Sequence, residues 1–262
     1  MGEALLPAAL IAYFSGIFLA LLGVGTRSRG AQRAAIVSLG IAWCLHLAAI
    51  VRLAILTGHF PLSSMGEYLL VLSWAVLSAY LLLSVRFRMQ GAGVLLPFLA
   101  FLMGATALAA PVKEIAVPDS HQQAWFIVHT TLATLGMAAL CVAFGMSLIY
   151  LLQDAALKSK RAPRLLEVLP SLEVCDRVGY DAVLWGFPLL TLGILTGALW
   201  SASVHHRFFS GGAKQTFPIL AWIVFAAVLY FRIAKGFRGR KSAYLTIAGF
   251  ALGLLTLLGM NR

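Results

Sequence analysis

Charged residues are scarce in this 262-residue chain, where Asp, Glu, Lys and Arg make up 11% of the sequence against 61% hydrophobic residues. A soluble domain of this length needs more charge to cover its surface, and the mean hydropathy of +0.92 agrees. Strand-like alternation of polar and apolar residues is also missing, which argues against an outer-membrane barrel. The composition therefore predicts a protein built of membrane-spanning helices.

Several chemical motifs are absent as well. The three cysteines, Cys44, Cys141 and Cys175, are far apart in sequence, so the chain has neither a CxxC redox pair nor a CxxCH haem-attachment site. It has no Gly-rich phosphate loop and no Ser-His-Asp spacing, and acidic residues are almost missing from the apolar runs. Hydrolysis and proton-coupled transport are thereby disfavoured, and the sequence predicts no catalytic residue.

What the chain does contain is eight apolar runs, each close to the roughly twenty residues that cross a bilayer as a helix. They predict a single polytopic domain over residues 1–262, an all-α bundle of about eight transmembrane helices. The expected helices are 5–24, 34–57, 67–86, 91–110, 124–153, 180–200, 216–235 and 242–260.

The basic residues gather in every second connection between these runs, which under the positive-inside rule places both termini outside. The same distribution assigns the net charge of +11 to membrane topology and not to nucleic-acid binding. The clusters are Arg27, Arg29 and Arg33; Arg86 and Arg88; Lys158, Lys160, Arg161, Arg164 and Arg177; and Lys235, Arg238, Arg240 and Lys241.

Histidine is the residue type most suggestive of chemistry. His46 lies near the middle of the second predicted helix and His59 at its outer end, His129 lies near the outer end of the fifth, and His205 and His206 lie in the third outer connection. Neutral imidazole is a good axial ligand for haem iron, and two facing histidines make a low-spin site. A lone intramembrane histidine can instead hydrogen-bond a neighbouring carbonyl or serine, and for His46 both interpretations stay open.

Two further residues have alternative interpretations. Arg52, inside the outer end of the second predicted helix, either reaches the headgroups with its long side chain or pairs with a carboxylate such as Glu67 or a haem propionate. Trp125, at the start of the fifth predicted helix, fits an aromatic belt at the membrane interface, and aromatic rings can also pack on a porphyrin face.

Four segments together resemble the cytochrome c assembly protein family, which includes the haem-handling synthases related to CcsA and CcmC and the HemX-like proteins. They are residues 47–74 (LAAIVRLAILTGHFPLSSMGEYLLVLSW), 125–137 (WFIVHTTLATLGM), 186–200 (GFPLLTLGILTGALW) and 237–259 (FRGRKSAYLTIAGFALGLLTLLG). The resemblance implies a helix bundle that holds haem and presents it on the outer membrane face. By position, His129 corresponds to the family's outer haem-ligating histidine, and Arg52, Pro61 and Glu67 fall on its pattern around the first outer loop.

The chain also departs from the family. Residues 201–216, SASVHHRFFSGGAKQT, stand where the synthases carry a tryptophan-rich loop, and Tyr230 stands where a histidine is frequent. The synthases continue to a second outer histidine where this sequence reaches Arg262. With two expected ligands missing, the pattern places the chain in the HemX-like branch and leaves an independent haem ligase activity unsupported.

These observations predict a multi-pass protein of a bacterial inner membrane that handles non-covalently bound b-type haem near the outer face during cytochrome c maturation. His129 is expected to bind the iron with His206 or His205 opposite, His46 is a candidate ligand of a second site, and His59, Arg52 and Trp125 are candidate haem contacts. Membrane lipids and another membrane protein, of cytochrome maturation or of a respiratory complex, are the expected partners. The alternatives are a haem-bearing electron-transfer or accessory subunit of a respiratory complex and a haem-free membrane scaffold.

Overall fold

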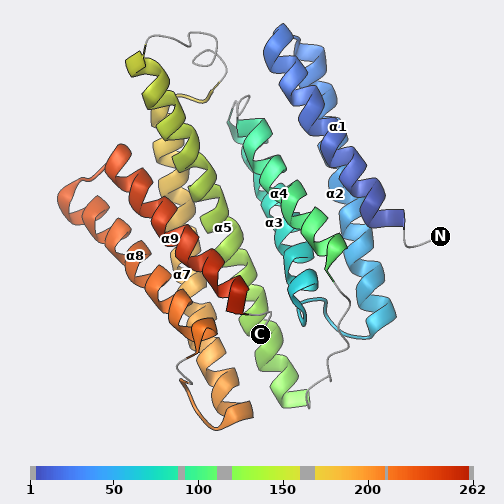
Figure 1. Cartoon of the computed structure of the whole chain (residues 1–262), viewed down its shortest axis with the longest axis vertical. Helices are drawn as coiled ribbons and strands as arrows, with labels where there is room; N and C mark the ends of the chain where they lie inside the picture. Colours follow the sequence, from blue (N-terminus) through green and yellow to red (C-terminus); the bar gives the residue numbers. More distant parts are fainter. Residues whose placement is uncertain (1–3, 88–91, 111–119, 160–168, 210–211, 260–262) are drawn as a thin grey trace. The chain divides into compact units, whose positions relative to one another are not determined.

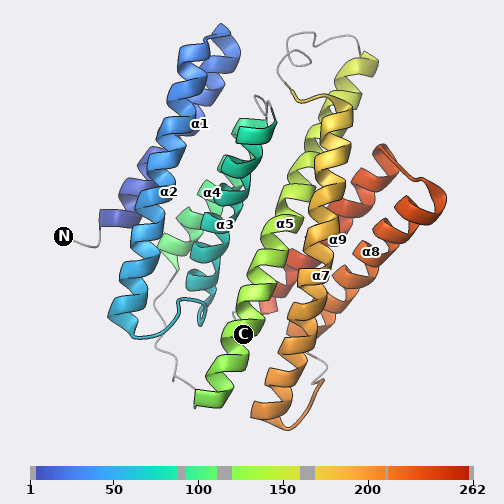
Figure 2. The same cartoon turned by 180° about the vertical axis from the view of Figure 1, so that it is seen from behind.

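The computed structural model describes residues 4–87, 92–110, 120–159, 169–209 and 212–259, and within these ranges every regular element is a helix. The helices are α1 (Leu5–Thr26), α2 (Arg29–Thr57), α3 (Met65–Arg86), α4 (Ala92–Ala109), α5 (Ser120–Ser159), α7 (Leu172–His205), α8 (Ala213–Lys235) and α9 (Arg240–Gly259). Figures 1 and 2 show them from opposite sides.

The expected all-α membrane fold is confirmed, since each of the eight predicted helices is present. Among the described residues, α1, α2, α3, α5, α7 and α8 are long and apolar enough to cross a membrane, whereas the apolar part of α4, Val94–Ala109, is shorter. Large apolar side chains on these helices are exposed, for example Trp185 with 73% of its surface. Such an apolar surface is suited to contact with the lipid of a bilayer. The placement of both termini outside stays a prediction.

The main difference from the expected boundaries is in α7, which begins at Leu172 and not near residue 180. The polar residues at its start, among them Glu173, Asp176 and Arg177, resemble a surface connection in sequence. They are helical because Ser171 accepts a hydrogen bond from the Val174 N–H at 3.3 Å, which caps the helix, and because Asp176 is engaged by other parts of the chain, as described below.

The described residues form two compact units. Unit 1 comprises Met1–Pro61, Gly66–Val112 and Leu152–Val174, and therefore contains α1 to α4. In it α1 and α2 lie side by side (Figures 1 and 2). Gly16 makes this approach close, because a Cβ there would lie 2.7 Å from the Cγ of Leu39. Small residues at helix contacts are the usual means of close packing in membranes.

Unit 2 comprises Leu62–Met65, Lys113–Leu151 and Cys175–Arg262. Its α5 and α7 approach closely through glycines that recur at helical spacing on α7, Gly186, Gly193 and Gly197, seven and four residues apart. A Cβ at Gly186 would lie 3.0 Å from the side chain of Leu140, and one at Gly193 would lie 3.3 Å from the backbone of Ala133. Residues 186–200, one of the four segments that resemble the family, therefore carry a helix-packing surface.

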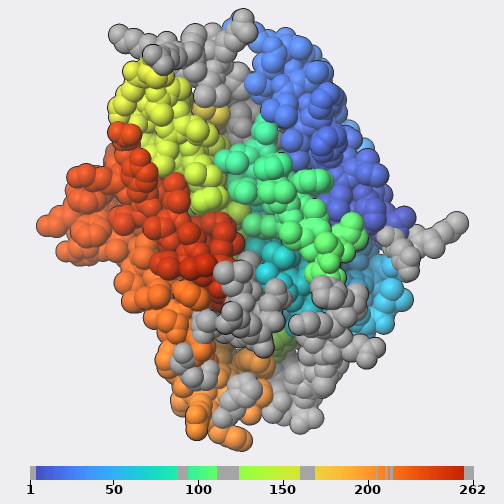
Figure 3. Space-filling model, viewed as in Figure 1, coloured from blue at the N-terminus to red at the C-terminus, as the bar shows by residue number. Residues whose placement is uncertain are grey.

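The other two helices of unit 2, α8 and α9, form a hairpin whose side chains are in continuous contact on the face seen in Figure 3. The Trp222 Nε1–H of α8 donates to the Thr191 hydroxyl of α7 at 2.9 Å, and the Trp222 ring stacks on Phe187 with centroids 5.4 Å apart. Phe250 of α9 stacks on Phe144 of α5 at 4.6 Å. These contacts hold the hairpin on α5 and α7.

Candidate functional site

His129 of α5 has one ring nitrogen fixed by the neighbouring helix. Its Nδ1 lies 2.7 Å from the backbone oxygen of Gly193 on α7. A carbonyl oxygen only accepts hydrogen bonds, so Nδ1 carries the proton and donates it. In the neutral ring, Nε2 then holds a lone pair and is the nitrogen available to bind a metal. The residue as a whole is partly buried.

Gly197, one helical turn after Gly193, provides the space that this ring occupies. A Cβ at Gly197 would lie 2.6 Å from Cε1 of His129 and 2.7 Å from Nδ1. No real Cβ comes that close to a ring atom, so a larger residue at this position would push the imidazole aside. Gly193 and Gly197 thus fix the position and the tautomer of His129 from the opposite helix, as outer partners of metal-binding histidines do.

Aromatic residues surround this end of the α5–α7 pair. Trp125 is one turn before His129, on the same face of α5, and 43% of its surface is exposed. On the neighbouring turns, Phe126 of α5 and Trp200 of α7 lie with ring centroids 5.5 Å apart and an angle of 53° between the planes. The expected interface position of Trp125 agrees with this exposure, and its role as a haem contact stays a prediction.

The adjacent histidines lie at the end of α7. His205 is its last residue, and its side chain is outside the described part of the structure. His206 is exposed, and its φ of 54° is in the left-handed region. It follows Gly197 by nine residues, about 13 Å of helix rise. Ser201 donates to the Arg207 carbonyl at 2.9 Å and accepts from the Gln215 amide at 3.3 Å, so the start of the connection folds back onto α7.

The remaining predicted site residues belong to unit 1. His46 is fully buried, and the Tyr13 hydroxyl lies 3.2 Å from its Nδ1. The backbone of Leu70 is close enough to interact with this ring, but Nε2 makes no hydrogen bond of standard geometry. The contact with Tyr13 agrees with a structural role for His46, and its role as a second-site ligand stays a prediction.

Arg52 lies one to two turns before the end of α2, and His59 follows the last residue of that helix, Thr57, by two positions. The His59 Nδ1 is 3.1 Å from the carbonyl of its neighbour Phe60. Arg52 is partly buried, and no ion pair of its guanidinium is found among the described residues. The proposed pairing of Arg52 with Glu67 is therefore not seen, which agrees with a side chain that extends to the headgroups.

No group of three or more His, Cys, Asp or Glu suited to a metal ion occurs in the described ranges. A haem iron differs from a bare metal ion in this respect, because the porphyrin supplies four ligands and the protein supplies one or two. The structure places His129 and Trp125 one turn apart on α5 in unit 2, whereas His46 and Arg52 lie on α2 and His59 lies just after that helix in unit 1.

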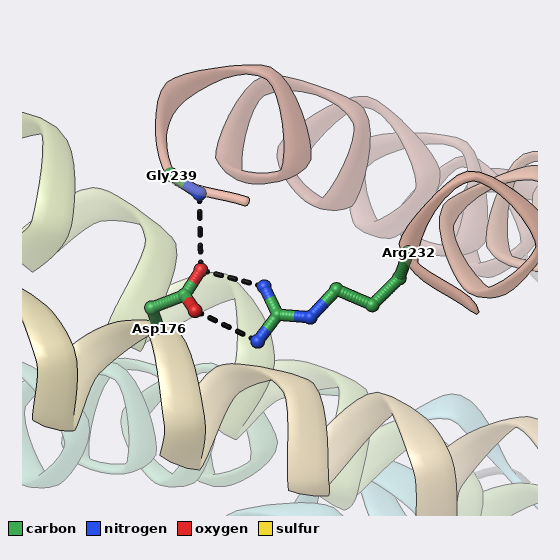
Figure 4. A network of polar contacts seen from close by, with 3 residues as sticks. All are labelled: Asp176, Arg232 and Gly239. Carbon is green, nitrogen blue, oxygen red and sulfur yellow. Dashed lines mark hydrogen bonds and ion pairs between the residues drawn. The ribbon is translucent and has the colours of Figure 1, made fainter. Parts of the chain in front are cut away.

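Sequence reasoning missed a charged cluster in unit 2 (Figure 4). The Asp176 carboxylate of α7 accepts from both terminal nitrogens of Arg232 of α8, each at 2.7 Å, and from the Gly239 N–H at 3.0 Å. The side chains of Arg232 and Asp176 are 10% and 18% exposed, and the guanidinium lies 4.6 Å from the centroid of the Tyr180 ring. The only sequence signal was that Asp176 and Arg232 both lie next to basic connections on the same predicted membrane face.

A small cavity of ≈ 20 Å³ adjoins this cluster. That volume admits about one water molecule. Its lining includes the polar side chains of Ser147, Tyr150, Cys175, Asp176, Ser242 and Thr246.

The family model and the similar proteins found by comparison all point to cytochrome c assembly. A family model described as "Cytochrome C assembly protein" matches residues 8–262. The cytochrome c biogenesis protein CcsA of Guillardia theta is 28% identical over 224 residues, covering 78% of this chain and 74% of that protein. CcsA of Chlamydomonas reinhardtii is 32% identical over 212 residues, covering 78% and 59%, and CcsA of Microcystis aeruginosa is 29% identical over 258 residues, covering 78% and 77%.

Among solved structures, a chain described as Cytochrome c Heme Lyase CcmF is similar with a TM-score of 0.70 and 18% sequence identity. The match covers 99% of this chain and 46% of that one, so this chain spans about half of the length of that chain. At this identity the similarity concerns the fold.

Proposed function

This chain belongs to the cytochrome c assembly protein family, and on that premise we propose that unit 2 holds b-type haem non-covalently where α5 meets the end of α7. In this proposal the protein presents haem on the outer membrane face for cytochrome c maturation, together with another membrane protein. It does so as a multi-pass protein of a bacterial inner membrane.

The hydrogen bond from His129 to the Gly193 carbonyl is the observation that carries the proposal. It directs the Nδ1 proton into α7 and leaves Nε2 as a ligand with its lone pair available. A metal-bound histidine nearly always donates its other N–H in this way, because the bond fixes the ring and raises its basicity. The residues present thus fit a haem whose iron His129 would hold through Nε2, and that haem would be the group that is delivered.

In this proposal the second ligand and most of the surrounding contacts come from the connection after α7. His206 is exposed beside Arg207, whose guanidinium suits a propionate. Phe208 and Phe209 follow, 66% and 54% exposed, and offer apolar surface for a porphyrin edge. Trp125 lies one turn before His129 and would cover the macrocycle from α5. His205 is the alternative second ligand.

The absorption spectrum tests the proposal directly. Protein purified in detergent after expression with ample haem is expected to show a sharp Soret band and, after dithionite reduction, a b-type α band. Pyridine haemochrome assay should give haem in a fixed ratio to protein. A featureless visible spectrum at full protein recovery would contradict the proposal and favour the haem-free scaffold. Haem that stays bound while quinol reduces it reversibly would favour the electron-transfer alternative.

A Gly197→Ala substitution tests whether the position of His129 matters for haem. The added Cβ would lie 2.6 Å from the ring, so His129 has to move and its bond to Gly193 weakens. We expect a shifted Soret band and a loss of haem affinity of about ten-fold or more, the range produced by loss of an outer partner of a metal ligand. The measurement is haem retention on dilution, followed spectroscopically.

Gly179→Ala on the same helix is the matched control, because its Cβ would make only an ordinary 3.5 Å contact with Met146. It adds the same methyl group to α7 far from His129. If the Gly197→Ala protein had an unchanged absorption spectrum and an unchanged haem affinity, the position of the His129 ring would have no influence on haem binding.

A further inference from the structure

The small cavity beside the Asp176–Arg232 pair lies between helices of unit 2. Residues of α5, α7, α8 and α9 line it, and its volume of ≈ 20 Å³ is enough for about one water molecule. On α9 the lining includes Ser242 and Thr246, which are one helical turn apart and therefore on the same face of that helix. The cavity thus has lining residues with hydroxyl groups on α9 and a residue with a carboxylate, Asp176, on α7.

The hydroxyls of Ser242 and Thr246 lack the hydrogen bond that a helix commonly offers them. A serine or threonine inside a helix can donate to the carbonyl one turn earlier, as Ser147, another lining residue, does to Ala143 at 2.8 Å. Among the residues that the structure describes, neither Ser242 nor Thr246 makes this bond or another hydrogen bond through its side chain. Thr246 is only 3% exposed, so bulk solvent does not replace the partner. A buried hydroxyl without a partner destabilises a fold, and a ligand that bonds to these groups is therefore favoured.

Asp176 keeps one position at which it can accept a hydrogen bond. A carboxylate has about four lone-pair positions. Its Oδ1 accepts from Arg232 and from the Gly239 N–H, whereas Oδ2 accepts only from Arg232 (Figure 4). The negative charge is already matched by Arg232, and Arg238 is also close enough to act on it. Asp176 thus offers an acceptor without an unbalanced charge, which favours a neutral hydrogen-bond donor over a cation.

We propose that this cavity binds one water molecule, which accepts from the Ser242 and Thr246 hydroxyls of α9 and donates to Oδ2 of Asp176 on α7. Ser147 of α5 uses its proton on Ala143, so its oxygen can accept the second proton of the water. A buried water commonly has two to four such polar partners. The water joins α9 to α5 and α7 beside the ion pair, and the inference is independent of the haem proposal.

Radiolytic labelling of the full-length protein in detergent and isotopically labelled water tests the proposal directly. Hydroxyl radicals formed from a bound water oxidise the side chains next to it, and cysteine thiols are readily oxidised. Cys175 lines the cavity with 2% of its surface exposed, whereas Cys141 is 0% exposed and does not line it. We expect Cys175 to take up the oxygen label several times faster than Cys141. Equal labelling of the two cysteines would overturn the proposal.

A pair of Thr→Val variants on α9 distinguishes a hydrated cavity from a dry one by the sign of the effect. With water bound, Thr246→Val loses a hydrogen bond, and the ratio of folded to unfolded protein should fall about five-fold. In a dry cavity the same change removes a buried hydroxyl without a partner and stabilises the fold. Thr256→Val is the control, because the Thr256 hydroxyl is buried without a partner in the described structure and does not line the cavity; this variant should lose no stability. A Thr246→Val protein at least as stable as the unaltered chain would contradict the water site.

The nature of the ligand is tested by changing the salt. Hydroxyl and carboxylate oxygens also suit a small cation, but the charge of Asp176 is matched by Arg232. Replacing NaCl by KCl or by choline chloride at equal ionic strength should therefore leave the unfolding temperature unchanged. A dependence on the identity of the cation would show that an ion occupies the cavity and would overturn the assignment to water. None of these measurements involves haem, so their outcome does not depend on the haem proposal.

Discussion

A His129→Gly variant is expected to lose its haem almost completely. The substitution removes the Nε2 ligand and vacates the space that the ring occupies next to Gly193 and Gly197. The loss should exceed the roughly ten- to hundred-fold decrease in affinity that follows removal of a mere outer partner of a ligand. Pyridine haemochrome assay and the reduced spectrum of the purified variant give the result.

Added imidazole provides a sharp check on this variant. Imidazole in the buffer can enter the vacated space, donate to the Gly193 carbonyl and offer its other nitrogen to iron. We expect part of the b-type spectrum to return. His59→Gly is the control, since this residue lies in unit 1 next to the Phe60 carbonyl and outside the haem site proposed in unit 2, and it should keep its haem. Full haem content in His129→Gly would contradict the assignment of the ligand but not the fold.

Replacing Asp176 with asparagine is expected to cause the largest loss of stability. Arg232 would keep its charge with only 10% of its side chain exposed and without a charged partner, and breaking a buried pair from one side costs about 3 kcal/mol or more. The bond to the Gly239 N–H would also weaken, because a neutral amide is a poorer acceptor than a carboxylate. The free energy of unfolding, measured by denaturant titration in mixed micelles, tests this.

The Lys158–Asp154 pair provides the contrast. Its nitrogen and oxygen are 3.1 Å apart, but 58% of the lysine side chain is exposed, so Lys158→Met should cost at most about 0.5 kcal/mol. An Asp176→Asn/Arg232→Gln double variant should recover part of the stability, because no charge is left buried without a partner. If Asp176→Asn costs no more than Lys158→Met, the cluster contributes nothing to the fold of unit 2.

Much of the fold follows from local sequence. A membrane helix must satisfy all of its backbone hydrogen bonds within itself, so each span is recorded in one uninterrupted apolar run. This is why eight helices could be predicted. The boundary of α7 could not be, because Asp176 and its neighbours resemble a connection until Arg232 and Gly239, 56 and 63 residues away, are placed beside them.

For the candidate site, the sequence by itself identified the family and pointed to His129, because histidine is rare in apolar runs and this one lies in a motif that resembles the family's. Only the tertiary structure decided which nitrogen of that ring is held by a hydrogen bond. The reason is that the accepting carbonyl of Gly193 is 64 residues away and is a backbone atom that no sequence motif reveals. The same holds for Gly197, whose missing Cβ matters only once α5 lies against α7. Composition thus determined that the chain enters a membrane as helices. Packing between the helices determined which hydrogen bonds its rare polar groups make.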